Sequence, residues 1–134
     1  MLNYKKILIL DPSPIFRRTL KEVIQTNETR VDVSEAQTVG QAEDILRSQS
    51  PDVVFLDIAL PRDDGIRFIE TIKGIAPQSR VVVLTNHDST EHKEAALRKG
   101  ADYFLSKEGT AGLRLLDVIH QTIRRPELVG QPDA

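Results

Sequence analysis

The amino-acid sequence predicts an α/β fold, a (βα)5 arrangement in which a five-stranded parallel sheet is doubly wound, with helices on both faces. Two observations support this: short apolar runs recur five times, and a segment with helical periodicity follows each run. Parallel strands joined in this way need right-handed helical crossovers. The strand order 2-1-3-4-5 fits best, because the second run alternates polar and apolar residues like an edge strand, whereas the first and third are the most apolar.

The apolar runs place the strands. In chain order, the expected strands are residues 6–10, 31–36, 53–57, 81–85 and 103–106. Each intervening helix has a start signal, either a side chain that can cap the helix or a residue suited to its first turn. These signals are Ser13 with Pro14, Thr38 with Gln41, Asp64 with Gly65, Asp88 with Glu91, and Thr110. Gly100 is expected to end the fourth helix.

Composition excludes several classes of protein. The formal net charge of −2 argues against nucleic acid as a partner, because phosphate-binding proteins need a basic face. The absence of cysteine excludes a disulfide framework, a thiolate nucleophile and a zinc–thiolate site. The apolar stretch near the N-terminus is too short for a signal peptide or a membrane span, so we expect a cytoplasmic protein with no membrane partner. Residues 125–134 have the composition of a tail or linker, which leaves residues 1–124 as the domain.

Polar side chains stand where four of the predicted strands end. Asp11 follows the first strand, Asp57 ends the third, Thr85 ends the fourth and Lys107 follows the fifth. In an open α/β sheet these carboxyl ends meet at one crevice, where ligands bind. Two carboxylates suit a hard cation such as Mg²⁺, and a lysine and a threonine can contact a phosphoryl group. The set predicts transfer of a phosphoryl group onto an aspartate.

Four segments closely resemble the receiver domain of bacterial two-component response regulators, over residues 4–124. They are "ILILDPSPIFRRTL", "PDVVFLDIALPRDDGIRFIETIK", "VVVLTNHD" and "KGADYFLSKEG". The element from Asp57 to Gly65, D-x-x-L-P-x-x-D-G, is the most specific of these signals. The resemblance implies a signalling domain with the flavodoxin-like receiver fold, and not an enzyme that acts on other substrates.

The resemblance also implies a role for each residue of the site. Asp57 would accept a phosphoryl group from a sensor histidine kinase or a phosphotransfer protein, and Asp11, Asp57 and the backbone carbonyl of Ala59 would hold Mg²⁺. Thr85 and Lys107 would contact the phosphoryl group. Thr85 and the aromatic residue Phe104 would form the switch. The fourth helix, fifth strand and fifth helix would present a face to a downstream effector protein. Gly65 would allow the turn that opens the third helix.

Pro12 departs from the family pattern, because receivers usually carry a second acid at this position. Proline suits an extended strand end, but its side chain has no oxygen ligand for the metal. Changes around a metal site typically lower metal affinity or activity by roughly 10 to 100-fold, and losing a ligand should lower them at least as much. We therefore expect weak Mg²⁺ binding. Ser13 could offer a hydroxyl to the site, but it is expected to cap the first helix.

A second departure is Glu108, which stands where many receivers have a proline after a cis peptide bond. A cis bond before a non-proline residue costs ~2.5 to 4 kcal/mol, so we expect the bond between Lys107 and Glu108 to be trans. The three histidines, His87, His92 and His120, lack the spacing of metal ligands, and the first two are expected to be solvated. Asp63 and Asp64, which precede Gly65, are expected to be turn and cap residues.

Two functions remain open at this point. One is a phosphorylation-dependent switch, and the other is an atypical receiver that works as a protein-interaction module because Pro12 weakens the Mg²⁺ site. A flavodoxin-like redox enzyme shares the predicted fold but needs a phosphate-binding loop rich in glycine and hydroxyls after the first strand. The "DPSP" sequence at Asp11 does not supply one, and aromatic residues to hold a flavin are scarce.

Overall fold

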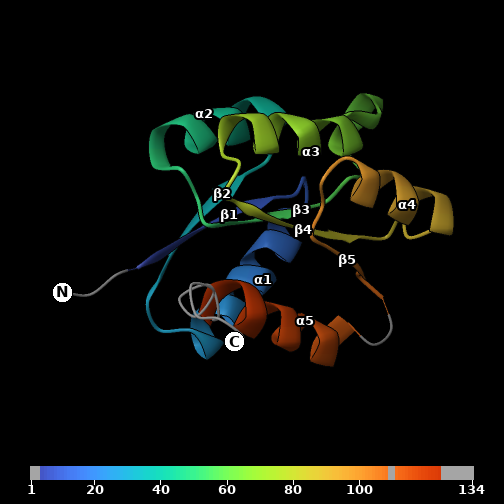
Figure 1. The fold of residues 1–134 in the computed structure, drawn as a ribbon. Coiled ribbons are helices and arrows are strands. Elements are labelled where there is room, and N and C mark those ends of the chain that lie inside the picture. Colours follow the sequence, from blue (N-terminus) through green and yellow to red (C-terminus); the bar gives the residue numbers. More distant parts are fainter. Residues whose placement is uncertain (1–3, 109–110, 125–134) are drawn as a thin grey trace, which may run out of the picture.

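A computed structural model describes residues 4–108 and 111–124, without the side chains of residues 63, 111–113 and 124. Its sheet has five parallel strands in the order β2-β1-β3-β4-β5, which confirms the predicted topology (Figure 1). The strands are β1 (Lys5–Leu10), β2 (Val31–Ala36), β3 (Val53–Leu56), β4 (Arg80–Thr85) and β5 (Tyr103–Ser106). The alternating segment is the edge strand β2, as expected.

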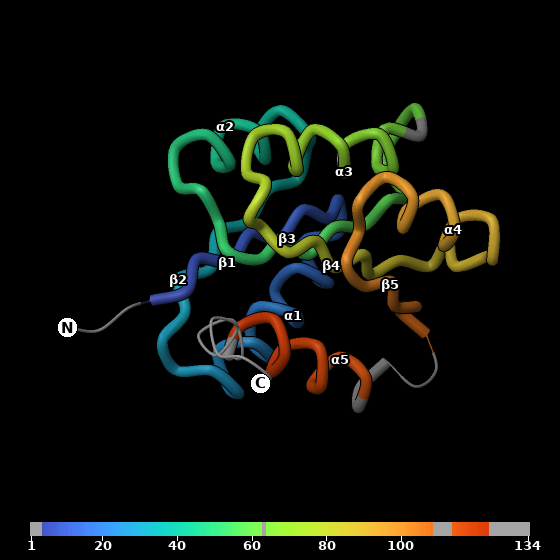
Figure 2. The backbone as a smooth tube through the Cα atoms, in the orientation of Figure 1, coloured from blue at the N-terminus to red at the C-terminus, as the bar shows by residue number. Residues whose placement is uncertain are grey.

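Helices cover both faces of the sheet, and the chain crosses between the two faces as it winds (Figures 1 and 2). One face carries α2 (Val39–Gln49), α3 (Asp64–Ile75) and α4 (Thr90–Arg98), and the other carries α1 (Pro14–Asn27) and α5 (Ala111–Ile119). In the described part of the chain, no helix is long and apolar enough to cross a membrane.

Two apolar clusters hold these layers together because successive side chains of a strand point to opposite faces. In β1, Leu8 and Leu10 belong to the cluster under α2 and α3, whereas Ile7 and Ile9 belong to the cluster under α1 and α5. All four side chains are at most 1% exposed. The central strands are therefore buried on both sides, which explains their unbroken apolar sequences.

Helix caps agree with the sequence at two helices and differ at a third. The Ser13 hydroxyl accepts the N–H of Phe16, and the Thr38 hydroxyl accepts that of Gln41, as predicted. The cap of α4 was wrongly predicted to be Asp88. Ser89 caps this helix instead.

The geometry of the loop before α4 explains the shift in its cap. The carboxylate of Asp88 is already engaged, because it accepts a hydrogen bond from the Ser106 hydroxyl at 2.7 Å. The hydroxyl of the next residue, Ser89, is then the group that reaches the N–H of His92, at 3.2 Å. The contact of Asp88 with β5 is a tertiary contact, which local sequence does not reveal.

The ends of the last two helices were only partly predicted. Gly100 follows α4 with φ 117°, a left-handed conformation that favours glycine, and this confirms its role as the stop. The last turn after α5 is a π-helix, His120–Arg124, which the sequence did not predict. Thr110, the expected start of α5, lies outside the described residues, as do residues 125–134.

Gly65 is needed for a different reason from the one expected. Its φ is not in the left-handed region, so the turn itself does not require glycine. Instead, a Cβ atom built at Gly65 would overlap the Cα atom and the carbonyl group of Ile58. The first turn of α3 therefore lies directly against the backbone that follows β3, next to Asp57.

We predict that Gly65→Ala destabilises the protein by about 1–3 kcal/mol, because the backbone at Ile58 cannot move aside as a side chain can. Gly74→Ala in the same helix is the matched control. It has open space around it and should stabilise the protein by a few tenths to about 1 kcal/mol. Urea unfolding measures both changes. Equal effects of the two substitutions would contradict the close approach.

Candidate functional site

The strand ends share one local motif. At the ends of β1, β3, β4 and β5, a side-chain oxygen accepts the backbone N–H of the residue two positions later. The pairs, acceptor first, are Asp11 and Ser13 at 2.8 Å, Asp57 and Ala59 at 2.8 Å, Thr85 and His87 at 3.1 Å, and Ser106 and Glu108 at 3.1 Å. Asp, Ser and Thr make such turns readily. The motif fixes each strand-end side chain against its own loop.

Backbone hydrogen bonds anchor the same residues to the neighbouring strands. The N–H of Asp11 donates to Ala36, that of Asp57 to Leu10, and that of Lys107 to the carbonyl of Thr85, at 2.9–3.1 Å. The strand pairing therefore continues past the ends of the regular strands. The register of that pairing sets the positions of Asp11, Asp57 and Lys107.

The structure brings the four predicted side chains into one cluster. The Lys107 ammonium lies 2.7 Å from Asp11 Oδ2 and 2.8 Å from Asp57 Oδ2, so it bridges the two carboxylates. The Thr85 hydroxyl donates to Asp57 Oδ1 at 2.6 Å. The two carboxylate side chains and Thr85 are buried, and that of Lys107 is 12% exposed. The longest of these contacts, from Asp11 to Lys107, joins residues separated by most of the chain.

Hydrogen bonds and charge set the ionisation of this cluster. Burial acts to raise the pKa of Asp57, but the hydrogen bonds from Lys107, Thr85 and Ala59, with the charge of Lys107, outweigh it and hold the pKa below its usual value. Burial likewise acts to lower the pKa of Lys107, and its hydrogen bonds and charge interactions with Asp11 and Asp57 raise it above the ordinary value. Asp57 and Lys107 therefore form an ion pair at neutral pH.

Two residues of the first helix join the site, and the sequence reading did not assign them to it. The Phe16 ring lies under the Lys107 ammonium, 4.1 Å from nitrogen to ring centroid, which is a cation–π contact. The Arg17 guanidinium donates to the backbone carbonyl of Asp11 at 2.6 Å and pairs with Glu35 at 3.1 Å. Their position in the first turn after Asp11 was the available signal.

The turn after β1 explains how Pro12 fits. The bond from the Ser13 N–H to Asp11 Oδ1 closes a turn in which Pro12 is the middle residue. Such a turn makes no use of the N–H of its middle residue, so a proline, which has none, is compatible with it. The Ser13 hydroxyl caps α1, as expected, and is engaged there.

The remaining predicted residues lie around this cluster. Phe104 is half-buried on β5 and packs against the cluster of side chains under α3. The peptide bond between Lys107 and Glu108 is trans, as expected, since the described residues contain no cis bond. Asp64 begins α3 and pairs with Arg67 at 3.5 Å. The side chain of Asp63 lies outside the described part.

The histidines differ in their surroundings. His87 is exposed and His92 is half-buried. Their rings are neighbours, with centroids 5.4 Å apart. His120 lies at the start of the π-helical turn, where its Nδ1 is 3.0 Å from Glu28 Oε2.

The donor chemistry of the cluster fits Mg²⁺, but its donor number is small. Asp11 and Asp57 supply carboxylate oxygens that converge on one cation, which here is the Lys107 ammonium. Within residues 4–108 and 111–124, no group of three or more His, Cys, Asp or Glu side chains is placed to hold a metal ion. Any Mg²⁺ would need carbonyl and water ligands to complete its six-fold shell.

Comparison with known proteins gives a consistent family. The family model of the response regulator receiver domain matches residues 7–122. The chain is 32% identical over 118 residues to the chemotaxis protein CheY of Bacillus subtilis, covering 88% of this chain and 97% of that protein. It is 31% identical over 106 residues to protein-glutamate methylesterase/protein-glutamine glutaminase 2 of Vibrio vulnificus, covering 78% of this chain and 31% of that protein.

A solved structure gives the same fold. The CheY-like receiver domain protein of Methanospirillum hungatei superposes with a TM-score of 0.83, at 23% identity, over 96% of this chain and 100% of that one. The lengths of the relatives differ. The chain spans nearly all of the chemotaxis protein but less than a third of the methylesterase.

The ionisation of the cluster predicts how stability depends on pH. The pKa of Asp57 is lower in the folded protein than its unfolded value of about 3.9, so its contribution is present above that pH and is lost as pH falls through the folded pKa. The pKa of Lys107 is raised above an unfolded value of about 10.4, so its contribution is complete below that pH and is lost as pH rises through the folded pKa.

Asp57→Asn should therefore flatten the acid limb of the plot of unfolding free energy against pH. In the variant, the loss of stability on the alkaline side should begin at a lower pH, because Lys107 keeps only Asp11 as a carboxylate partner. The free energy of unfolding in urea, measured from pH 3 to pH 11, tests this. A variant profile parallel to that of the wild type on both limbs would contradict the assignment.

Proposed function

The chain belongs to the response regulator receiver domains, and we propose on that basis that Asp57 accepts a phosphoryl group from a sensor histidine kinase or a phosphotransfer protein. The observation that supports this most is the bridge from Lys107 to Asp57 and Asp11, with Thr85 hydrogen bonded to Asp57. The proposal takes residues 1–124 as the receiver unit and keeps the expected cytoplasmic location. It assigns no reaction beyond transfer to Asp57 itself and hydrolysis of the product.

In the proposed step, a carboxylate oxygen of Asp57 forms a bond to the phosphorus of a phosphohistidine. The P–N bond breaks, and the donor imidazole leaves with a proton. The ion pair keeps Asp57 in the carboxylate form that this attack needs. The Lys107 ammonium then has a phosphoryl oxygen to contact in place of carboxylate oxygen, and it offsets the charge that arrives.

The proposed switch starts from the hydroxyl of Thr85. It now donates to Asp57 Oδ1, and a phosphoryl oxygen on Asp57 would compete for that hydrogen bond. The Thr85 hydroxyl also accepts the N–H of His87, so a movement of Thr85 would displace the loop that leads to α4. Phe104 lies on the neighbouring strand, paired with Val83. Through Thr85 and Phe104, the face formed by α4, β5 and α5 would change its affinity for an effector protein.

Mg²⁺ belongs to the proposal as a weakly held ion. Asp11, Asp57 and the carbonyl of Ala59 would hold it, and it supplies neutralising charge for the phosphoryl oxygens when bound. With Pro12 in place of an acid, Lys107 carries a larger share of that neutralisation.

A second function is supported by the same departure. An atypical receiver would use its fold as an interaction module, and Asp57 would stay unphosphorylated because the metal site lacks an acid at Pro12. The contacts of the cluster are compatible with this, since Lys107 pairs with both carboxylates without a metal.

We predict that the wild-type chain gains the mass of one phosphoryl group when it is incubated with acetyl phosphate and millimolar Mg²⁺. Asp57→Asn removes the acceptor oxygen and should gain none. Pro12→Asp restores an acid and should raise the initial rate of phosphorylation at limiting Mg²⁺ by at least about 10-fold, since losing groups around a metal site lowers metal affinity or activity by roughly that factor. Intact-protein mass spectrometry follows all three chains in parallel.

The outcomes separate the two functions. Modification of the wild type that Asp57→Asn abolishes supports the phosphorylation switch. If the Pro12→Asp variant is modified and the wild type is not, the natural chain is the atypical module. Failure of both chains, in folded protein, would overturn the proposal that Asp57 is a phosphoacceptor.

A further inference from the structure

The loop between β4 and α4 brings two imidazoles together beside the phosphoacceptor cluster. His87 lies in this loop and His92 lies in the first turn of α4. Their ring centroids are 5.4 Å apart and their planes are inclined by 33°. Both rings line a hollow of about 220 Å³, whose other walls are the apolar side chains of Ile58 and Ile66. The five-residue spacing did not suggest a pair, because it is the turn before the helix that folds the two rings together.

Both imidazoles have nitrogen atoms that are free to bind a ligand. The Nδ1 atom of His92 lies 2.8 Å from the Ser89 hydroxyl, which orients the ring and leaves Nε2 available. In the described part of the chain, the His87 ring makes no hydrogen bond, and only its backbone N–H is engaged, by Thr85. His92 thus has the arrangement typical of a metal-ligating histidine, in which a second group fixes one ring nitrogen and leaves the other for the metal, and the unbonded ring of His87 stands beside it.

The spacing of the rings fits a single shared ion. Two imidazoles bound to one Zn²⁺ at ~2.0–2.1 Å with a tetrahedral angle have ring centroids on the order of 5 Å apart. We propose that His87 and His92 form a binding site for a divalent late transition-metal ion of the Zn²⁺, Ni²⁺ and Cu²⁺ class. No third His, Cys, Asp or Glu completes a cluster among the described residues, so water would fill the remaining positions.

The site is chemically distinct from the acidic cluster. Imidazole nitrogens select late transition metals, whereas carboxylate and carbonyl oxygens select Mg²⁺. The two sites are nevertheless linked, because the N–H of His87 donates to the Thr85 hydroxyl, which donates to Asp57. An ion that ties His87 to His92 holds the loop in the conformation in which Thr85 bonds Asp57. Binding of the ion itself does not depend on the proposed phosphorylation.

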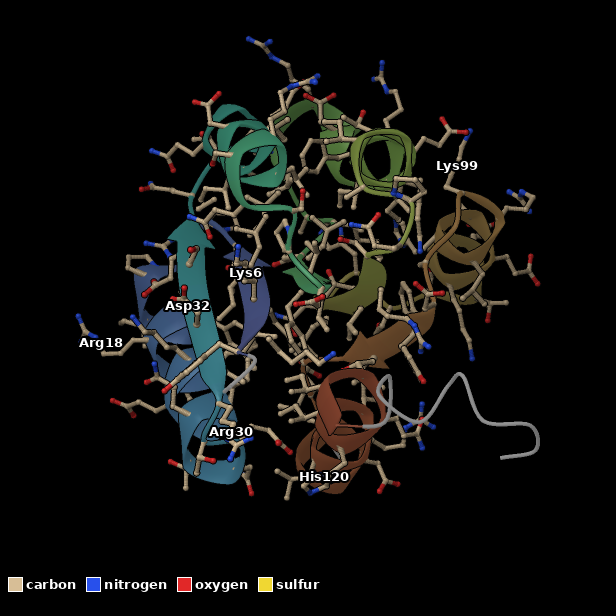
Figure 3. All side chains as sticks on the ribbon, turned by 60° about the vertical axis from the view of Figure 1, so that its left-hand side comes forward. Lys6, Arg18, Arg30, Asp32, Lys99 and His120 are labelled. Carbon is tan, nitrogen blue, oxygen red and sulfur yellow. The ribbon has the colours of Figure 1, made fainter. Side chains whose placement is uncertain are left out.

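Isothermal titration of the untagged chain with Zn²⁺ tests the site. The wild type should bind one ion, and His87→Ala and His92→Ala should each weaken binding by at least about 10-fold. His120→Ala is the matched control and should bind as the wild type does, since His120 lies on the α5 side of the molecule, away from α4 (Figure 3). Asp57→Asn tests whether Zn²⁺ instead enters the acidic cluster, and should also bind normally. Circular dichroism confirms that each variant is folded.

Each outcome decides the proposal. Loss of binding in both His87→Ala and His92→Ala, with His120→Ala and Asp57→Asn unchanged, supports it. Binding that persists in the His87→Ala/His92→Ala double variant, or that disappears only in Asp57→Asn, would overturn it. Absence of saturable binding to the wild type at millimolar Zn²⁺ would do the same. A separate readout, the His87 and His92 imidazole resonances in NMR spectra, should shift on Zn²⁺ addition while those of His120 do not.

Discussion

The rest of the site depends on one interaction, the bridge that the Lys107 ammonium makes between the carboxylates of Asp11 and Asp57. Two carboxylates, Asp11 and Asp57, end neighbouring strands and are almost fully buried, so without a cation they would repel each other and lack solvation. The Lys107 ammonium lies 2.7 and 2.8 Å from the two carboxylates, and the Phe16 ring makes a cation–π contact with the same ammonium. Removing one member of a buried charge cluster leaves the others uncompensated, which is why the whole arrangement is sensitive to this one side chain.

The sheet makes this contact possible because it fixes where each group stands. Strand pairing continues through the backbone of Asp11, Asp57 and Lys107, so their positions follow from the register of buried strands. The close approach of Gly65 to Ile58 keeps α3 against the loop that carries Asp57. Pro12 is accommodated because the turn after Asp11 makes no use of a middle N–H. The backbone at this position therefore accommodates proline, and the proposed consequence of Pro12 is for metal binding.

Sequence patterns predicted the sheet and the site better than they predicted the contacts between loops. The strand order could be predicted because apolar runs and polar alternation report burial directly, and the convergence of Asp11, Asp57, Thr85 and Lys107 follows from that order. The predicted cap of α4, Asp88, was wrong because its carboxylate accepts a hydrogen bond from Ser106, a residue of β5.

Other features were missed for the same reason. The contact of Phe16 with Lys107 joins the first helix to the end of the fifth strand, and the proximity of His87 and His92 depends on how the loop before α4 folds. Local periodicity carries no record of such loop-to-loop distances. The roles proposed for Ala59 and Phe104 come from family resemblance and not from a local sequence pattern.

A double-mutant cycle on Lys107 and Asp57 tests the central interaction most directly. Lys107→Met, Asp57→Asn and the double variant are compared with the wild type by urea unfolding at neutral pH. A buried, charged hydrogen bond predicts a coupling energy of at least about 1.5 kcal/mol between the two sites. Effects that add to within about 0.5 kcal/mol would show that the two side chains act independently, and would contradict the account.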